Sequence, residues 1–299
     1  SGLRDLRTLQ TLAAFLQQML TPLVRTALRG KSMEALTAPR ELPVTVLFCD
    51  LRGSVRTIEQ GAANLLSTWD TVSQALTVMT EAIVQFDGVI GDFQGDAAMG
   101  FWGWPLPQED QIERAAKAAL AIRRRFSQFT RERHPTLATF VCGIGLAHGP
   151  AIAGKLGSAD QMKIGVFGPA VNRAARLESA TKAMHVQILV DQDVTNALGA
   201  VPWCRVRKVA RVIPQGMRAP VLIGELLPPE SEPDSLPNET TRTTYEAALE
   251  RFLARDWPAA REIFDRIPDD GPAGFVTRFM DLHPDGPPED WSGGIPVTK

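Results

Sequence analysis

The chain has 299 residues, of which 44% are hydrophobic and 22% charged, an ordinary composition for a globular protein. A formal net charge of −2 and a pI of about 6.1 argue against a nucleic-acid-binding protein with a broad basic surface. Cys49, Cys142 and Cys204 are scattered and form no C-x-x-C pair, so neither a disulfide framework nor a zinc site is indicated. Without an apolar run of about 18 residues or a signal-peptide core, we expect a cytoplasmic protein that does not insert into membranes.

The first predicted unit is a helical arm over residues 1–41. Apolar residues recur every three or four positions across residues 3–20, which predicts an amphipathic helix. A second helical stretch follows to about residue 29, and "TAPRELP" forms a linker into the next domain. Two interpretations of the arm remain open: it packs on its own domain, or it pairs with a second copy of the chain.

Residues 42–228 alternate predicted strands and helices. "VTVLFCD" is a buried strand ending in an acid, and residues 65–86 have a helical pattern. "GVIGDF" and "AAMGFWG" predict a hairpin, and residues 110–129 an Ala- and Arg-rich helix. "ATFVCGIGLAHGPAIAGKLG" predicts a second hairpin that turns at His148, Gly149 and Pro150. A short strand "KIGVFG", a helix over 170–181 and a strand "QILVD" complete the pattern, which indicates an α+β fold with a mostly antiparallel sheet.

The C-terminal part is predicted to be helical. Residues 229–240 are rich in Pro, Ser and acids and serve as a linker. In the tail, residues 241–299, helical patterns cover 241–255 and 257–266, and a third short helix runs over 272–282. The first two helices resemble a single tetratricopeptide-type pair. Because one such repeat cannot bury its own core, we expect it to dock on the preceding domain or on a partner chain.

The first candidate functional residue is Asp50, at the end of a buried strand. The following "LRGS" lets Gly53 and Ser54 open a helix. A strand, a small-residue turn and a helix N-terminus surround an anion with backbone N–H groups, while the acid holds a cation. The alternative is a simple turn or helix cap.

Asp96 strengthens the case for a metal site. The hairpin tip at Gln94, Gly95 and Asp96 can lie beside the end of the first strand, which brings two carboxylates to one sheet edge. Two neighbouring carboxylates repel unless a divalent cation separates them, and Mg²⁺ or Mn²⁺ commonly binds one or two carboxylates together with substrate phosphates.

The third candidate pair is Asn172 and Arg176 in "VFGPAVNRAARLESA". Four residues apart on a helix, they share one face. A guanidinium can stabilise charge on a transferring phosphoryl group, and an amide can orient a ribose oxygen. A surface Asn and a salt-bridged Arg are the alternative.

Together, "TVLFCDLRGS", "FQGDAAMGFWG" and "VFGPAVNRAARLES" resemble, in order and spacing, the two metal motifs and the transition-state helix of class III nucleotidyl cyclases. The resemblance implies a ferredoxin-like, palm-type domain that forms a head-to-tail homodimer with active sites at the interface. It implies that Asp50, Leu51 and Asp96 bind two Mn²⁺ or Mg²⁺ ions in one protomer, and that Asn172 and Arg176 come from the other. The implied reaction converts a nucleoside triphosphate to a 3′,5′-cyclic nucleotide and pyrophosphate.

The positions that read the base depart from the adenylate cyclase pattern. That pattern has Lys four residues before the second metal acid and Asp or Thr three before the Gly that precedes the helix; here these positions are Asp92 and Gly165. An acid facing no side chain cannot match adenine in the same way. Guanylate cyclases have Glu instead of Lys, so Asp92 is one methylene short, and Gly165 leaves room for a purine edge. The absence of a recognisable transmembrane or long sensory segment favours the stand-alone bacterial pyrimidine cyclases of anti-phage signalling. The order of preference is pyrimidine, guanine, adenine.

One further departure concerns the triphosphate. The family often carries a phosphate-binding Lys near the end of the domain, where this chain has Gln215 in "VIPQGMRAP". Arg218 is the predicted replacement, with Lys163 as an alternative, beside Gly53 and Ser54. A different class of function also stays open, in which the domain holds a nucleotide without cyclising it and the tail recruits a partner.

Overall fold

The structure is a computed structural model that describes residues 35, 37–52, 64–157, 162–214, 219–233 and 235–297. The two predicted helices of the N-terminal arm lie outside the described residues. No described helix is long and apolar enough to cross a membrane.

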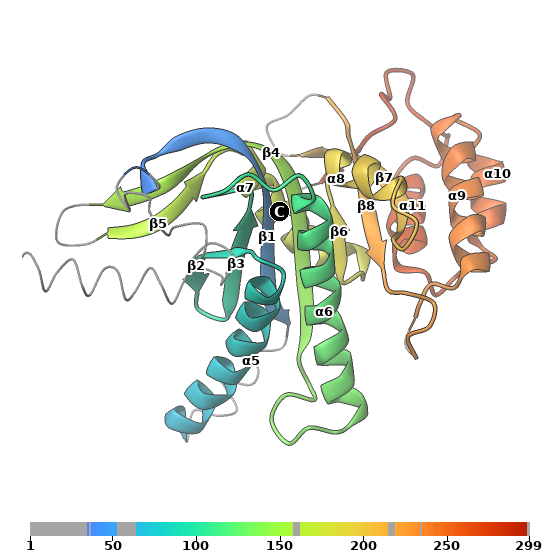
Figure 1. Cartoon of the computed structure of the whole chain (residues 1–299). Helices are drawn as coiled ribbons and strands as arrows, with labels where there is room; N and C mark the ends of the chain where they lie inside the picture. Colours follow the sequence, from blue (N-terminus) through green and yellow to red (C-terminus); the bar gives the residue numbers. More distant parts are fainter. Residues whose placement is uncertain are drawn as a thin grey trace, which may run out of the picture.

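A mostly antiparallel sheet forms the centre of the fold (Figure 1). Its strands are β1 (Arg40–Arg52), β2 (Val89–Gln94), β3 (Ala97–Trp102), β4 (Val141–Gly157), β5 (Met162–Phe167), β6 (Ile188–Val190), β7 (Arg205–Pro214), β8 (Val221–Leu227) and β9 (Ile295–Val297). The order is β2-β3-β1-β4-β6-β8-β7-β9, with β5 paired to β4. The β4–β6 and β7–β9 pairs are parallel, and the other pairs are antiparallel. The predicted α+β class is confirmed.

Seven helices are described with this sheet: α5 (Leu65–Gln85), α6 (Gln111–Arg131), α7 (Pro169–Met184), α8 (Gln192–Gly199), α9 (Glu239–Leu253), α10 (Trp257–Phe264) and α11 (Gly271–Asp281). Most lie where the apolar periodicity predicts a helix. Several begin at a residue whose side chain caps the helix. At the start of α11, for example, the carboxylate of Asp270 accepts a hydrogen bond from the N–H of Ala273.

One predicted hairpin is wrong. The segment with His148, Gly149 and Pro150 does not turn; it is the middle of the single strand β4, which pairs with β1 from Arg52↔Val141 to Arg40↔Ala153. Gly149 serves a close approach, because a Cβ atom there would lie 2.7 Å from Nη2 of Arg173 on α7. The reversal comes later, between β4 and β5. A Gly-Pro pair therefore marks a contact with a helix here, and not a turn.

The sheet separates two hydrophobic cores, and β1 shows the alternation that divides them. Val44 and Val46 belong to the core shared with α7, whereas Leu47, Cys49 and Leu51 belong to the core shared with α5 and α6. Successive side chains of a strand point to opposite faces. Asp50 therefore lies on the same face as Val46, the face covered by α7.

The helices α9, α10 and α11 form the C-terminal helical unit, which lies at the opposite end of the molecule from the β4–β5 hairpin (Figure 1). The residues predicted to point inward are buried: Tyr245, Ala248, Phe252, Trp257, Ala260 and Phe264. They continue the core that contains α7, β7 and β9. The predicted docking of this unit thus occurs on its own chain.

Candidate functional site

The two predicted metal acids meet at the end of β1. Asp50 pairs in register with Ala97 of β3, so Asp96, the preceding residue, lies beside it. The Asp50 side chain is 26% exposed. Burial raises the pKa of Asp50, and repulsion from the Asp96 carboxylate raises it further. The structure therefore brings together the two acids that the sequence pairs.

This pair of acids fits a divalent cation. Carboxylate oxygens are the ligands that Mg²⁺ and Mn²⁺ prefer, and such ions take their other ligands from substrate phosphates and water. Within the described ranges no group of three or more His, Cys, Asp or Glu side chains is placed to hold a metal. The Leu51 side chain is 3% exposed and packs in the core under α5 and α6. The Leu51 side chain therefore offers no ligand, and the predicted contribution of Leu51 to a metal would come from its backbone.

Two further charged residues reach Asp50 from α7 and were missed by the sequence analysis. The ammonium of Lys182 lies 3.6 Å from Oδ2 of Asp50 and lowers the pKa of that carboxyl in part. Glu178 is 8% exposed, and its Oε1 has no hydrogen-bond partner. Burial raises the pKa of Glu178, and Asp50 contributes to the rise. Helical spacing is the signal that could have found them. Glu178 and Lys182 are four residues apart, and so share a face, on the helix that carries Asn172 and Arg176.

The close seat of α7 on β4 depends on two glycines. A Cβ atom at Gly145 would lie 2.1 Å from the carbonyl oxygen of Ala174, and one at Gly143 would lie 2.7 Å from Oε1 of Glu178. Gly143 pairs directly with Asp50 across the strands. Small residues on β4 therefore allow the Glu178 carboxylate to approach the metal acids.

Asn172 and Arg176 lie on the exposed face of α7, as their spacing predicts. Neither side chain has a hydrogen bond or ion pair with another described residue. The end of α7, and not its beginning, meets Asp50 of the same chain. A single chain thus brings Asp50 and Asp96 together, whereas no described contact joins Asn172 or Arg176 to these acids.

The predicted base-reading positions lie on β2 and β5, which are not paired in the described sheet but are joined by a side-chain contact. Asp92 is on β2, and Oδ2 of its carboxylate accepts a hydrogen bond from Nζ of Lys163 on β5 at 2.9 Å. This bond to Lys163 is the main cause of a lowered pKa of Asp92. Lys163 lies two residues before Gly165, on the same face of β5. Lys163, the predicted alternative phosphate ligand, therefore contacts the acid at the predicted base-reading position.

The space expected above Gly165 is smaller than a glycine suggests. A Cβ atom at Gly165 would be in contact with Cδ2 of Leu156, at 3.3 Å. Leu156 comes from the paired strand β4, where it is opposite Lys163. The side chains of Leu156 and Lys163 thus border the position at which the sequence predicts room for a purine edge.

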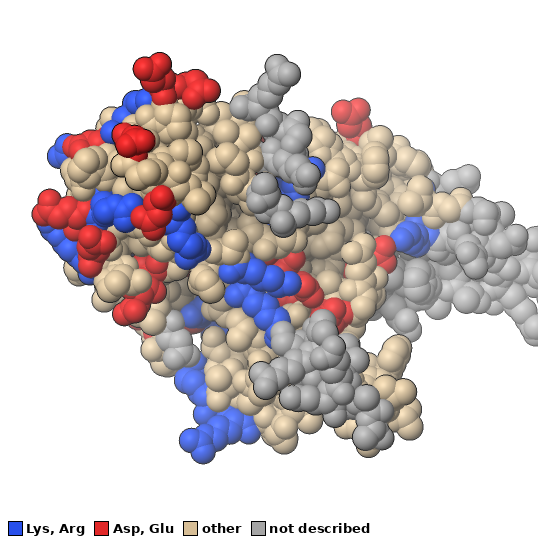
Figure 2. Space-filling model, turned by 180° about the vertical axis from the view of Figure 1, so that it is seen from behind, with Lys and Arg blue, Asp and Glu red and all other residues tan. Residues whose placement is uncertain are grey.

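The predicted phosphate ligands Gly53, Ser54 and Arg218 lie outside the described residues, as does Gln215. The face seen in Figure 2 carries acidic and basic side chains interspersed over the C-terminal helical unit, without a field of one sign.

Residues 36–212 match the family described as the adenylate and guanylate cyclase catalytic domain. The chain belongs to this family.

Relatives and solved structures agree with that assignment. An adenylate cyclase of Anabaena cylindrica is 29% identical over 160 residues, which cover 52% of this chain and 30% of that protein. An uncharacterized protein of Mycobacterium tuberculosis is 28% identical over 172 residues, which cover 54% of this chain and 30% of that protein. The chain thus matches less than a third of the length of these relatives.

Two solved structures have the same fold, although one is named an adenylyl cyclase and the other a guanylyl cyclase. The adenylyl cyclase CyaB from P. aeruginosa has a TM-score of 0.56 at 24% identity, covering 66% of this chain and 98% of its own. The guanylyl cyclase Cya2 has a TM-score of 0.53 at 26% identity, covering 66% of this chain and 97% of its own. The fold therefore does not select between adenine and guanine.

Proposed function

We propose that the chain is a nucleotide cyclase that converts a nucleoside triphosphate to a 3′,5′-cyclic nucleotide and pyrophosphate. The observation that carries this proposal is the facing pair Asp50 and Asp96, with the pKa of Asp50 raised by burial and by its neighbour. Such a pair favours the binding of a cation between the acids. Family membership supplies the class of reaction.

In the proposed reaction the ribose 3′-oxygen attacks the α-phosphorus, the bond to the β-phosphate oxygen breaks, and the hydroxyl proton passes to solvent. Asp50 and Asp96 would hold Mn²⁺ or Mg²⁺, which when bound lowers the pKa of the 3′-hydroxyl and neutralises phosphate charge. Arg176 would donate to the oxygens of the transferring phosphoryl group, and Asn172 would orient the ribose.

The proposed enzyme is a head-to-tail homodimer. Its support is that no described contact within one chain joins Asn172 or Arg176 to the two acids, which leaves each site incomplete without a second copy. The β4–β5 hairpin also exposes an apolar face: Ile152, Leu156 and Phe167 are 48%, 59% and 77% exposed. Contiguous exposed apolar side chains are typical of interaction surfaces.

For the base we propose a preference for a pyrimidine, with guanine second and adenine third. The support is the Asp92–Lys163 pair together with Leu156 beside Gly165. The pair offers an acceptor next to a donor, which suits the N3–H and a carbonyl oxygen of uracil. Leu156 and Lys163 reduce the space for a second ring. A pyrimidine product would fit the second-messenger signalling of bacterial antiviral defence.

The test is incubation of the purified protein with ATP, GTP, CTP and UTP separately, with Mn²⁺, and identification of products by mass. A cyclic pyrimidine nucleotide supports the whole proposal, whereas cyclic GMP or cyclic AMP retains the reaction and overturns the base preference. Absence of pyrophosphate release with all four substrates would point to a silent nucleotide-binding protein.

A further inference from the structure

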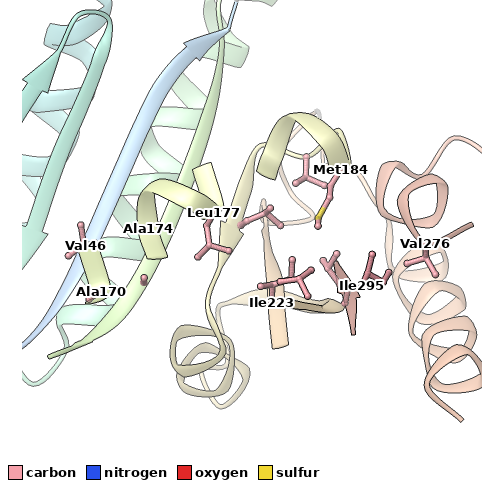
Figure 3. Packing of buried hydrophobic residues seen from close by; sticks show 14 of the residues in the cluster. Val46, Ala170, Ala174, Leu177, Met184, Ile223, Val276 and Ile295 are labelled. Atoms are coloured by element: carbon pink, nitrogen blue, oxygen red, sulfur yellow. The ribbon is translucent and has the colours of Figure 1, made fainter. Parts of the chain in front are cut away.

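The helix α7 rests on two different supports. Ala170, Ala174 and Leu177 pack toward the sheet. Met184, at the end of the helix, is in the same buried cluster as Val276 of α11 (Figure 3). One continuous row of buried side chains thus runs from β1 along α7 to the C-terminal helical unit. The unit that holds the end of α7 lies outside the matched family region.

The contact between α11 and the end of α7 is close and polar. Nη2 of Arg278 donates to the carbonyl oxygen of Ala183 at 2.9 Å. A Cβ atom at Gly271 would lie 2.2 Å from the carbonyl oxygen of Met184 and 2.9 Å from Cβ of His185. Carbonyls in the last turn of a helix have no partner within the helix. Arg278 of α11 therefore caps a carbonyl in the last turn of α7, and Gly271 lets the start of α11 approach the end of that helix.

The helical unit is itself anchored to the sheet. Arg207 of β7 is 1% exposed, and its guanidinium pairs with Glu225 of β8 at 2.6 Å and with Asp270 at 2.8 Å. Asp270 is the N-cap of α11. Because Gly271 follows directly, the residue that contacts the end of α7 is held against the far strands of the sheet. A buried, fully paired arginine of this kind is costly to break.

We propose that α11 is a positioning element for the catalytic helix α7, with Gly271 and Arg278 as positioning residues. A helix is stiff along its axis, so a shift of its last turn moves Asn172 and Arg176 as well. This inference rests on the proposed function, since it assigns α7 to the transition state of a cyclase. It predicts that a loosened α11 lowers kcat and leaves KM nearly unchanged.

The test uses mixed dimers in which only one site works. A protomer with Asp50→Ala is co-expressed with a protomer with Arg176→Ala, and the mixed dimer is purified by two tags. Its working site takes the acids from the Arg176→Ala protomer and Asn172 and Arg176 from the Asp50→Ala protomer. Recovery of turnover in this mixture tests the head-to-tail arrangement before α11 is changed.

Gly271→Ala is then placed in one protomer at a time. In the Asp50→Ala protomer, whose α7 is in use, we expect a loss in kcat on the order of tenfold to a hundredfold. In the Arg176→Ala protomer, whose Asn172 and Arg176 are not used but whose Lys182 on α7 contacts the working Asp50, the same change should cause a clearly smaller loss. Equal losses in both placements, or no loss in either, would overturn the proposal, because a general loss of fold acts on both.

Arg278→Ala tests the same contact with an exposed side chain, and we expect a smaller loss of roughly threefold to tenfold. Arg278→Lys should restore turnover, because an ammonium can also donate to the Ala183 carbonyl. The matched control is Arg261→Ala, since Arg261 pairs with Asp281 inside the helical unit at 2.7 Å. A loss with Arg261→Ala equal to that with Arg278→Ala would count against the proposal.

Hydrogen exchange supplies a readout that does not depend on turnover. Amides in the last turn of α7 should exchange faster in Arg278→Ala than in Arg261→Ala or in the unchanged protein. If the mixed dimers do not complement, the head-to-tail arrangement fails, and this exchange measurement still decides whether α11 holds α7. Unchanged exchange would overturn the proposal that α11 holds the end of α7.

Discussion

The proposed metal edge, with Asp50 and Asp96, and the proposed base edge, with Asp92 and Lys163, shift the pKa values of their carboxylates in opposite directions. At the metal edge, burial and a second acid raise the pKa of Asp50. At the base edge, a hydrogen bond from Lys163 lowers the pKa of Asp92. Asp50 has the Lys182 ammonium at 3.6 Å, which offsets only part of the rise in its pKa, whereas Asp92 accepts a hydrogen bond from Lys163 at 2.9 Å. This contrast supports our proposal that a cation from solution completes the metal edge, while the chain itself supplies the partner of Asp92 at the base edge.

The largest expected effect concerns the metal edge. Asp50→Asn keeps the shape of the side chain and removes its charge, so we expect turnover with Mn²⁺ to fall by roughly a hundredfold to a thousandfold. The measurement is pyrophosphate release at saturating nucleotide, with circular dichroism to verify the fold. Asp285→Asn, in the C-terminal region, is the control. Turnover close to that of the unchanged protein would refute the metal assignment.

The second prediction concerns the proposed dimer interface, on the hairpin that also carries Lys163 of the base edge. Phe167→Asp places a charge on the apolar face of the β4–β5 hairpin, and we expect the dimer dissociation constant to rise by about tenfold to a hundredfold. Analytical ultracentrifugation gives this constant. Leu282→Asp is a matched control, because Leu282 is 74% exposed but lies in the C-terminal region. A similar weakening in both variants would remove the hairpin from the interface.

The third prediction concerns substitution of the two predicted base-reading residues. Asp92→Lys combined with Gly165→Asp installs the pair expected of an adenine reader, so the ratio of kcat/KM for ATP to that for UTP should rise by about tenfold or more. The added Cβ at position 165 would lie 3.3 Å from Cδ2 and 3.4 Å from Cβ of Leu156, a contact that a small shift of this side chain can relieve. The control is Asp92→Asn, which removes the charge without installing the pair. An unchanged ratio would show that these positions do not read the base.

The smallest effect is on stability without metal. Because the pKa of Asp50 is raised in the folded protein, the folded state binds its proton more tightly than the unfolded state, and stability falls as pH rises from the unfolded to the folded pKa. At neutral pH the metal-free Asp50→Asn variant should therefore melt higher than the unchanged protein by a few degrees, roughly. Below the ordinary range of an aspartic acid this difference should vanish. A lower melting temperature at neutral pH would contradict the repulsion.

Local patterns in the sequence predict much of this molecule. The pairing of Asp50 with Asp96 follows from a strand that ends in an acid and a hairpin tip that ends in another, and the inward residues of α9 and α10 follow from helical spacing. The continuous strand β4 could not be predicted in this way. Gly149 and Pro150 form a pair typical of turns, and only the position of Arg173 against Gly149 shows why they occur within a strand. Lys182 and Glu178 were missed for a related reason, since their contact with Asp50 depends on how α7 crosses the sheet.

The buried Arg207 also constrains where the chain can be divided. Its partners Glu225 and Asp270 come from the sheet and from the helical unit, and its guanidinium lies 4.7 Å from the ring centroid of Tyr245 on α9. A shortened protein ending before residue 241 would lose Asp270 and Tyr245 and expose a surface built around Met184, Ile223 and Val212. The boundary that composition draws between the two parts is therefore not a place where an expression experiment or a recombination event can cut without cost.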